Sequence, residues 1–181
     1  VTETAGTAVG LGQRAHAEPL LLTERSGVRE YHSVVFVRSD SPIHHLDDLR
    51  GHTLALQSVA STSAYLVPVM TLLQHGMAPQ ILQSPDDTPP ADSVGYVFAR
   101  SELNIATFVH KGLVDAGAVS SVDWSDERRV PPAFKRDLRV ILRSEPFPRA
   151  VELVRGDLEP RVRARLQQVL LEAASDPAVR E

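Results

Sequence analysis

The 181-residue sequence contains no cysteine. This absence excludes a disulfide-stabilised scaffold, cysteine-ligated zinc sites and cysteine nucleophiles. Aromatic residues are scarce, at 5% of the chain, and no stretch approaches the roughly 18 consecutive apolar residues of a membrane-spanning helix. The first residues also lack the basic start and apolar stretch of a secretory signal.

Basic charge is not in excess either. The net charge is −4, whereas a general nucleic-acid surface requires a clustered basic excess, so we expect no nucleic-acid partner. The remaining composition, 43% hydrophobic and 23% charged, is that of an ordinary folded chain. A chain of this length forms one domain or two small lobes.

Sequence motifs of catalysis are missing as well. The chain has no G-x-S-x-G, no Walker-type phosphate loop and no G-x-G-x-x-G. Among the seven histidines, His44 and His45 are adjacent, so on a strand they would point to opposite faces, and no second ligand pair follows at zinc spacing. We therefore expect no catalytic residue, no cofactor and no metal.

Short apolar segments alternate with helical patterns along most of the chain. Residues 31–38 are apolar on both faces, which is typical of a strand covered on both sides by helices. Similar strands are expected at residues 53–57, 95–99, 113–119 and 138–142. The alternation predicts an α/β fold with a mostly parallel sheet.

The clearest helix is expected at residues 61–75. Its apolar residues recur at helical spacing, and Gly76 stands where a left-handed cap is favoured. Pro68 is irregular in this position because it removes a backbone donor and kinks a helix. Further helices are expected at residues 104–111 and from Pro160 onward, whereas residues 121–136 remain ambiguous.

Three consecutive hydroxyl residues, Ser61, Thr62 and Ser63, stand between the expected strand 53–57 and this helix. A strand-to-helix junction presents free backbone N–H groups and the positive end of the helix dipole. The hydroxyl groups add donors, so the segment can hold an anion without a basic side chain. The alternative is that Ser61 only caps the helix and that its neighbours are ordinary first-turn residues.

Three segments resemble the substrate-binding proteins of phosphate, phosphite and phosphonate ABC transporters, which are type II periplasmic binding proteins. Residues 31–51 are similar to a tyrosine-led strand followed by a D-L-K-G turn. Residues 61–68, STSAYLVP, match a family S-T-S-G-Y-x-x-P, which also accounts for the proline. Residues 112–119, GLVDAGAV, match a family G-x-V-D-A-G-A-V. The order and spacing of the three segments fit over roughly residues 31–154.

The resemblance implies two α/β lobes joined by a hinge, with the N-terminal part of lobe 1 lacking. Residues 1–40 would be a remnant of lobe 1 with the first hinge strand. Residues 41–136 would form a complete lobe 2, and residues 137–181 would return to lobe 1. The implied ligand is a small phosphorus oxyanion held in the inter-lobe cleft. The implied partner is an ABC transporter permease, at a periplasmic or cell-surface location.

The resemblance also implies which residues bind. Ser61, Thr62 and Ser63 would hold the oxygens of the ligand, and Tyr31 would donate its hydroxyl from the opposite side. Tyr31 alternatively is a packed aromatic with a solvated tip.

The sequence departs from the family pattern in three places. Ala64 replaces a usual glycine, and Arg100, Ser101 and Glu102 stand where G-S-H is frequent. Ser101 and Glu102 are therefore candidate binding residues, with a surface role as the alternative for Glu102. No carboxylate stands where family members hold the amine of aminoalkyl phosphonates, although Asp123 is one position away. A ligand with an uncharged tail is therefore expected.

Two other classes of function stay open. The same fold also hosts small-molecule biosynthetic enzymes, and a sensory module is a third interpretation. The absence of cysteine and of a carboxylate–histidine pair counts against an enzyme. The final helix carries Arg161, Arg163 and Arg165 opposite its apolar stripe, which indicates a solvated face or contact with a permease or anionic lipid.

Overall fold

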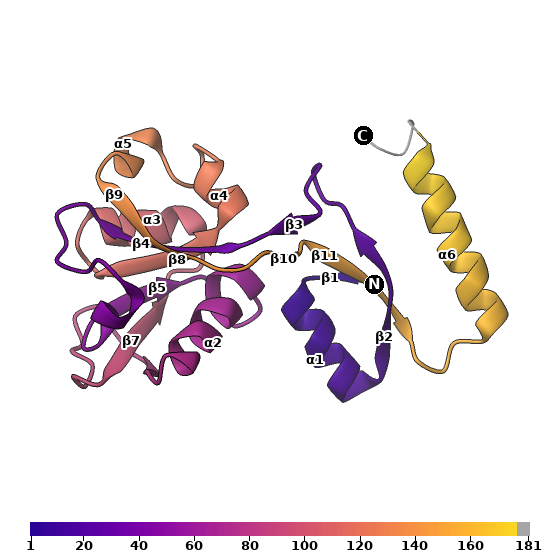
Figure 1. Cartoon of the computed structure of the whole chain (residues 1–181), viewed down its shortest axis with the longest axis horizontal. Helices are drawn as coiled ribbons and strands as arrows, with labels where there is room; N and C mark the ends of the chain where they lie inside the picture. Colours follow the sequence, from indigo (N-terminus) through magenta and orange to yellow (C-terminus); the bar gives the residue numbers. More distant parts are fainter. Residues whose placement is uncertain (177–181) are drawn as a thin grey trace. The chain divides into compact units, whose positions relative to one another are not determined.

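A computed structural model describes residues 1–176 and divides the chain into two compact units (Figure 1). One unit is Tyr31–Phe147, and the other combines Val1–Glu30 with Pro148–Glu181. The chain passes between the units in two short paired strands, β3 (Glu30–Tyr31) and β10 (Phe147–Pro148), and each strand has one residue in either unit. None of the helices within residues 1–176 is long and apolar enough to cross a bilayer.

The Tyr31–Phe147 unit is built on a six-stranded sheet with the order β6-β7-β5-β8-β4-β9. The strands are β4 (Ser33–Arg38), β5 (Thr53–Leu56), β6 (Ala78–Ile81), β7 (Ser93–Phe98), β8 (Ala116–Ser120) and β9 (Leu138–Arg143). Strands β6, β7, β5 and β8 are parallel, whereas β4 runs antiparallel to both β8 and β9. The α/β fold expected from the alternating sequence pattern is therefore present, with one strand reversed.

Helices cover both faces of this sheet. Val34 and Phe36 of β4 pack on one side with α3 (Glu102–His110), and the same cluster includes Trp124 of α4 (Ser121–Ser125). Val35 and Val37 pack on the opposite side in a cluster that includes Leu72 of α2 (Val67–Gln74). This explains why residues 31–38 are apolar on both faces. The short η1 (Leu46–Leu49) joins the α2 face, and α5 (Pro132–Lys135) follows α4.

The second unit has a smaller, antiparallel sheet with the order β1-β11-β2. Its strands are β1 (Thr2–Glu3), β2 (Ala17–Thr23) and β11 (Ala150–Arg155). Helix α1 (Ala5–Ala15) packs Ala8 against Val151 and Leu153 of β11. Helix α6 (Pro160–Ser175) follows β11 and has no buried residue.

Candidate functional site

The hydroxyl segment follows β5 in the middle of the six-stranded sheet. Ser61 is in the extended conformation, and its Oγ accepts the N–H of Ala64 at 3.1 Å, so Ser61 is a helix N-cap. Thr62 and Ser63 are 5% and 6% exposed. Because the Ser61 Oγ uses a lone pair for the cap, its own proton stays available for a ligand oxygen.

The next residues form a wide turn, η2 (Thr62–Leu66), before the regular helix α2. In this turn the N–H of Leu66 donates to the carbonyl of Ser61 at 3.0 Å, five residues back. Pro68 cannot donate to the carbonyl of Ala64, four residues before it. That carbonyl instead accepts the N–H of Gln57 at 3.1 Å, which ties the end of β5 to the turn. The proline therefore shapes the hydroxyl segment rather than breaking a straight helix.

A buried serine from another strand supports this segment. Ser33 begins β4 and lies opposite Ser120, the last residue of β8, in the antiparallel register. The hydroxyl of Ser33 donates to the carbonyl of Ser63 at 2.6 Å, and the N–H of Ser33 donates to Ser144 Oγ at 3.0 Å. Through its hydroxyl, Ser33 thus holds the backbone of the predicted anion site at Ser63.

Ser120 is engaged with α4. Its Oγ accepts the N–H of Asp123 at 3.0 Å and donates to the carboxylate of Asp123. Asp123, the carboxylate nearest to the position used for ligand amines in the family, is therefore committed to the start of α4. Sequence reasoning missed Ser33 and Ser120 as parts of the site. The available signal was a serine at the first position of β4 and another at the last position of β8.

Ser101 and Glu102 lie at the start of α3, after β7. Ser101 Oγ accepts the N–H of Asn104 at 3.2 Å and is the N-cap of α3. Glu102 makes an ion pair with Arg129 at 3.1 Å. The neighbouring Arg100 has a left-handed backbone with φ 71°, and its N–H donates to the carbonyl of Gln57 at 3.2 Å. A non-glycine residue in this region is uncommon, and such residues concentrate at functional sites.

These segments meet at one edge of the sheet. The carboxyl ends of parallel β5, β7 and β8 lead to the Ser61 segment, Ser101 and Ser120, and antiparallel β4 begins there with Ser33. The chain leaves β5 for α2 on one face and leaves β7 for α3 on the other face. Adjacent strands with connections to opposite faces define the place where open α/β sheets bind ligands. We call this edge the hydroxyl edge.

Tyr31 lies in the same unit, at the entry to β4. It is 4% exposed, and its ring lies 4.7 Å from the ring of Phe147, centroid to centroid. The ring is therefore packed, whereas the solvated tip of the alternative interpretation does not match this small exposure.

Aromatic side chains accompany the hydroxyl segment on the α2 face. The ring of Tyr65 in η2 lies 5.9 Å from that of Tyr96 and 5.4 Å from that of Phe98. Burial, together with a hydrogen bond with Tyr65, raises the pKa of Tyr96 to about 12. The phenol of Tyr96 therefore remains neutral at physiological pH and adds no negative charge near an anion.

Within residues 1–176, no group of three or more His, Asp or Glu side chains is arranged to hold a metal ion. The hydroxyl edge presents oriented N–H and O–H donors instead. Such donors are suited to holding an anion.

Comparisons with a family model and with solved structures agree on one protein family. A sequence model for the periplasmic substrate-binding proteins of phosphonate ABC transporters matches residues 3–181. XAC2383 from Xanthomonas citri, solved with chloride, is 57% identical over 99% of this chain, with a TM-score of 0.93. The chain spans 64% of the length of that protein. The same protein has also been solved with ATP, at 58% identity over 98% of this chain and 64% of that one, with a TM-score of 0.93.

More distant structures share the fold. A binding-protein component of an ABC phosphonate transporter from Pseudomonas aeruginosa is 22% identical, with 94% of this chain and 55% of that chain covered and a TM-score of 0.64. PhnD1 from Prochlorococcus marinus, in complex with methylphosphonate, is 20% identical, with 95% and 62% covered and a TM-score of 0.60.

Proposed function

Because this chain belongs to the family of periplasmic substrate-binding proteins of phosphonate ABC transporters, we propose that it binds a small phosphorus oxyanion at the hydroxyl edge. The ligand would be a phosphonate, phosphite or phosphate, and the bound chain would deliver it to the permease of an ABC transporter in the periplasm or at the cell surface. No bond is made or broken in this function.

The observation that carries the proposal is the hydroxyl segment itself. Ser61 caps the turn while keeping its proton for a ligand, and the segment opens a helix on a buried, apolar sheet. The first N–H groups of a helix have no acceptor within the helix, and the helix dipole favours an anion there. Hydrogen bonds to an anion are roughly twice as strong as neutral ones, so a few donors suffice.

The ligands of the relatives support an anion in general. The Xanthomonas protein has been solved with chloride and with ATP, and the Prochlorococcus protein with methylphosphonate. These ligands share negative charge, and two of them share a tetrahedral phosphorus. We propose Ser61, Thr62 and Ser63 as direct ligands of the oxygens, with Ser101 and Tyr31 as further donors. Glu102 would act through its ion pair with Arg129, since a free carboxylate would repel the ligand.

An enzyme or a sensory module on the same fold is the alternative. A histidine kinase sensor domain with similarity to periplasmic binding proteins shares the fold, with a TM-score of 0.52. Turnover of any titrated ligand would favour an enzyme.

The test is calorimetric titration of the 181-residue chain with phosphate, phosphite, methylphosphonate, aminoethylphosphonate and ATP. We expect saturable binding of one of the first three, and weaker binding of aminoethylphosphonate because Asp123 is engaged with Ser120. Absence of binding by all five ligands would contradict the proposal.

Variants separate binding from folding. Ser61→Asp keeps a good N-cap, so the fold should persist, but its carboxylate should repel the anion and abolish binding. Thr62→Val removes one hydroxyl at nearly constant shape and should weaken binding about tenfold, the loss of one net charge-assisted hydrogen bond. Ser125→Ala is the matched control, because this exposed serine lies outside the hydroxyl edge. Unchanged affinity in Ser61→Asp would exclude the hydroxyl segment as the site.

A further inference from the structure

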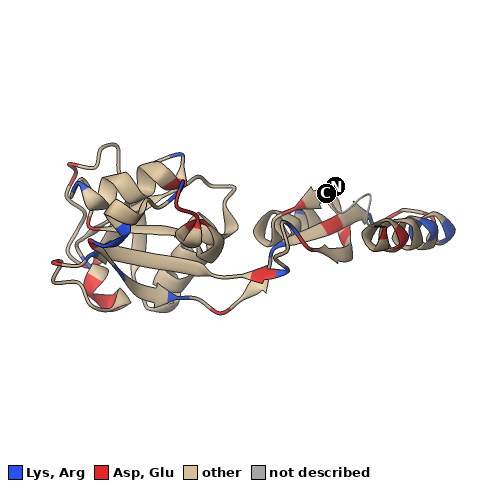
Figure 2. Cartoon of the chain, turned by 90° about the horizontal axis from the view of Figure 1, so that it is seen from above, with Lys and Arg blue, Asp and Glu red and all other residues tan. Residues whose placement is uncertain are grey.

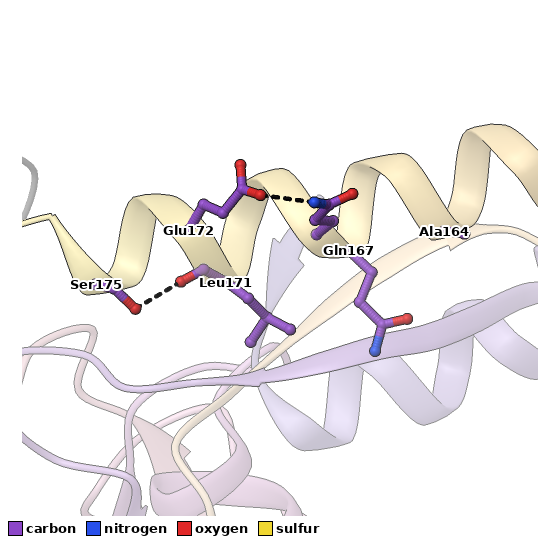
Figure 3. A pocket seen from close by; sticks show the side chains of 6 residues that line it. Ala164, Gln167, Leu171, Glu172 and Ser175 are labelled. Atoms are coloured by element: carbon purple, nitrogen blue, oxygen red, sulfur yellow. Dashed lines mark hydrogen bonds between the residues drawn. The ribbon is translucent and has the colours of Figure 1, made fainter.

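A hollow of about 610 Å³ lies along α6, but its lining does not suit an anion (Figure 3). Of the residues that line it, Glu172 carries a charge, and this side chain accepts a hydrogen bond from Gln168 at 2.7 Å. Ser175 donates to the carbonyl of Leu171 at 3.0 Å. A negatively charged lining repels an oxyanion. The positive charge available to an oxyanion therefore lies elsewhere in the chain.

Basic and acidic residues lie interspersed along both units, and several arginines have an acidic partner (Figure 2). In the Tyr31–Phe147 unit these ion pairs are Arg38 with Asp40, Arg128 with Asp126 and Arg129 with Glu102. In the other unit, Arg163 of α6 pairs with Glu18 and donates to the carbonyl of Pro19 at 2.9 Å. Arg163 therefore contacts β2, contrary to the solvated face expected for the three arginines of this helix. An arginine paired in this way has less charge to offer a ligand.

Arg100, at the hydroxyl edge, is different. It is exposed, and within residues 1–176 its guanidinium has no ion-pair or hydrogen-bond partner. The acidic residue closest to it in sequence, Glu102, is engaged with Arg129. The N–H of Arg100 donates to the carbonyl of Gln57 at 3.2 Å, so its backbone is tied to the segment that leads from β5 to the hydroxyl residues. A positive charge without an acidic partner thus stands next to the predicted anion site.

The backbone of Arg100 adds a second observation. Its φ of 71° lies in the left-handed region, where a Cβ is disfavoured and glycine is not. Glycine is also the residue that is frequent at this position in the family. The chain therefore has an arginine where glycine would fold more easily, and no contact of its guanidinium within the described residues offsets that cost. A contact with the ligand would offset it.

The same edge is poor in free acceptors. The carboxylate of Asp123 accepts from the hydroxyl of Ser120, and that of Glu102 accepts from Arg129. A singly charged phosphorus oxyacid still carries an O–H, which needs an acceptor, whereas the doubly charged form has only accepting oxygens. The second proton leaves close to neutral pH, at about pH 6 for a phosphate ester. Donors combined with an unpaired positive charge therefore favour the doubly charged form.

We propose that Arg100 is a specificity-determining residue, which binds the phosphorus oxyanion directly and selects its doubly charged form. This inference rests on the proposed function of the hydroxyl edge. A guanidinium presents N–H donors in a planar fork that matches two oxygens of a phosphoryl group, and its charge does not titrate in proteins. The neutral hydroxyl and N–H groups of Ser61, Thr62 and Ser63 would hold the ligand without distinguishing its charge states to the same degree.

Calorimetric titration of the 181-residue chain at two pH values tests the inference. The ligands are phosphate, phosphite and methylphosphonate at about pH 5 and about pH 8.5, on either side of the loss of the second proton. Sulfate, which is doubly charged at both pH values, is the reference ligand. Each phosphorus ligand that binds should do so about tenfold more tightly at the higher pH, the value of one charge-assisted hydrogen bond. Sulfate should show no such gain.

Titration of the protein itself is controlled separately. The other ionisable side chains at this edge come from several elements, and they are Tyr31, His32, Tyr65, Glu102 and Asp123. The Nε2 of His32 accepts from Arg143 at 3.1 Å, so protonation of this ring would remove a contact and add a charge. His32→Gln should keep the pH dependence of the wild type. A similar pH dependence for sulfate, or its loss in His32→Gln, would assign the effect to the protein and overturn the inference.

Arg100→Gln and Arg100→Gly both remove the charge, and the second also relieves the backbone, so its urea midpoint should not fall. Both variants should lose the tenfold gain at the higher pH. Arg136→Gln is the matched control and should bind like the wild type, because this exposed arginine precedes β9 at the edge of the sheet where β4 ends. Wild-type pH dependence in the Arg100 variants would overturn the inference and leave the proposed function intact. Absence of binding of all three phosphorus ligands at both pH values would contradict both.

Discussion

The Tyr31–Phe147 unit packs helices on both faces of a six-stranded sheet, whereas the other unit leaves its longest helix without one buried side chain. Both units contain similar helical sequences with apolar stripes. The two units differ in what packs against each apolar stripe. Leu72 of α2 is 1% exposed against the sheet, and Leu166 of α6 is 37% exposed. An apolar stripe predicts a helix, but only its packing partner determines how much that helix stabilises the fold.

The largest expected effect on stability comes from a substitution in the core of the Tyr31–Phe147 unit. Phe36 is fully buried, and its ring lies 4.9 Å from that of Trp124. Phe36→Ala should lower the free energy of unfolding by about 3–5 kcal/mol, through lost transfer energy and the cavity left behind. Urea unfolding followed by Trp124 fluorescence measures the change. Leu22→Ala in the other unit, at a residue 69% exposed, is the control and should stay within about 0.5 kcal/mol.

A second change overfills the same core. A Cβ on Gly117 would lie 2.6 Å from a methyl group of Ile105 and 2.9 Å from the ring of Phe36. Gly117→Ala should therefore cost about 1–3 kcal/mol, because α3 must move away from the sheet. The urea midpoint of this variant checks the close approach of α3. An unchanged midpoint would mean that α3 does not pack as closely as described.

A third change links the core to the anion site. Ser33→Ala removes the donor to the buried carbonyl of Ser63 and should cost about 1–3 kcal/mol of stability. It should also weaken ligand binding, because the hydroxyl segment loses its support from β4. Thermal unfolding with and without the tightest ligand measures both effects. Binding that stays at the wild-type level would show that Ser33 supports the fold alone.

The smallest expected effect is in α6. Leu166→Ala in the 181-residue chain should change the free energy of unfolding by less than about 0.5 kcal/mol, because the side chain is already largely in water. The matched Leu72→Ala in α2 should cost about 2–5 kcal/mol. Equal losses in the two variants would contradict the contrast between the units.

Much of the fold of the Tyr31–Phe147 unit follows from the sequence. Strand β4 is apolar on both faces because both faces are covered, and Gly76 and Gly112 end helices with φ of 67° and 69°. Helix α1 was not expected, because its sequence contains three glycines and begins with small and polar residues. Its stability comes from Ala8 meeting β11, some 140 residues later in the chain, which no local pattern reports.

The site was predictable to a similar extent. Hydroxyl residues before an apolar helix predicted an anion site, with an N-cap role for Ser61 as the alternative. The structure has the N-cap, and the anion site stays a prediction. The support from Ser33 was not predictable, since its position opposite Ser120 depends on the antiparallel register of β4 and β8. Pro68 was predicted to kink a helix. In the structure the wide turn η2 stands before Pro68 and accommodates its missing backbone donor.

The central claim is that the hydroxyl edge of the Tyr31–Phe147 unit binds an oxyanion. Its most direct test is an NMR titration of the ¹⁵N-labelled chain with methylphosphonate. Saturable shifts of the amide signals of Ser61, Thr62, Ser63 and Ser101, with α6 unaffected, are the predicted result. Shifts confined to other regions, or none at millimolar ligand, would contradict it.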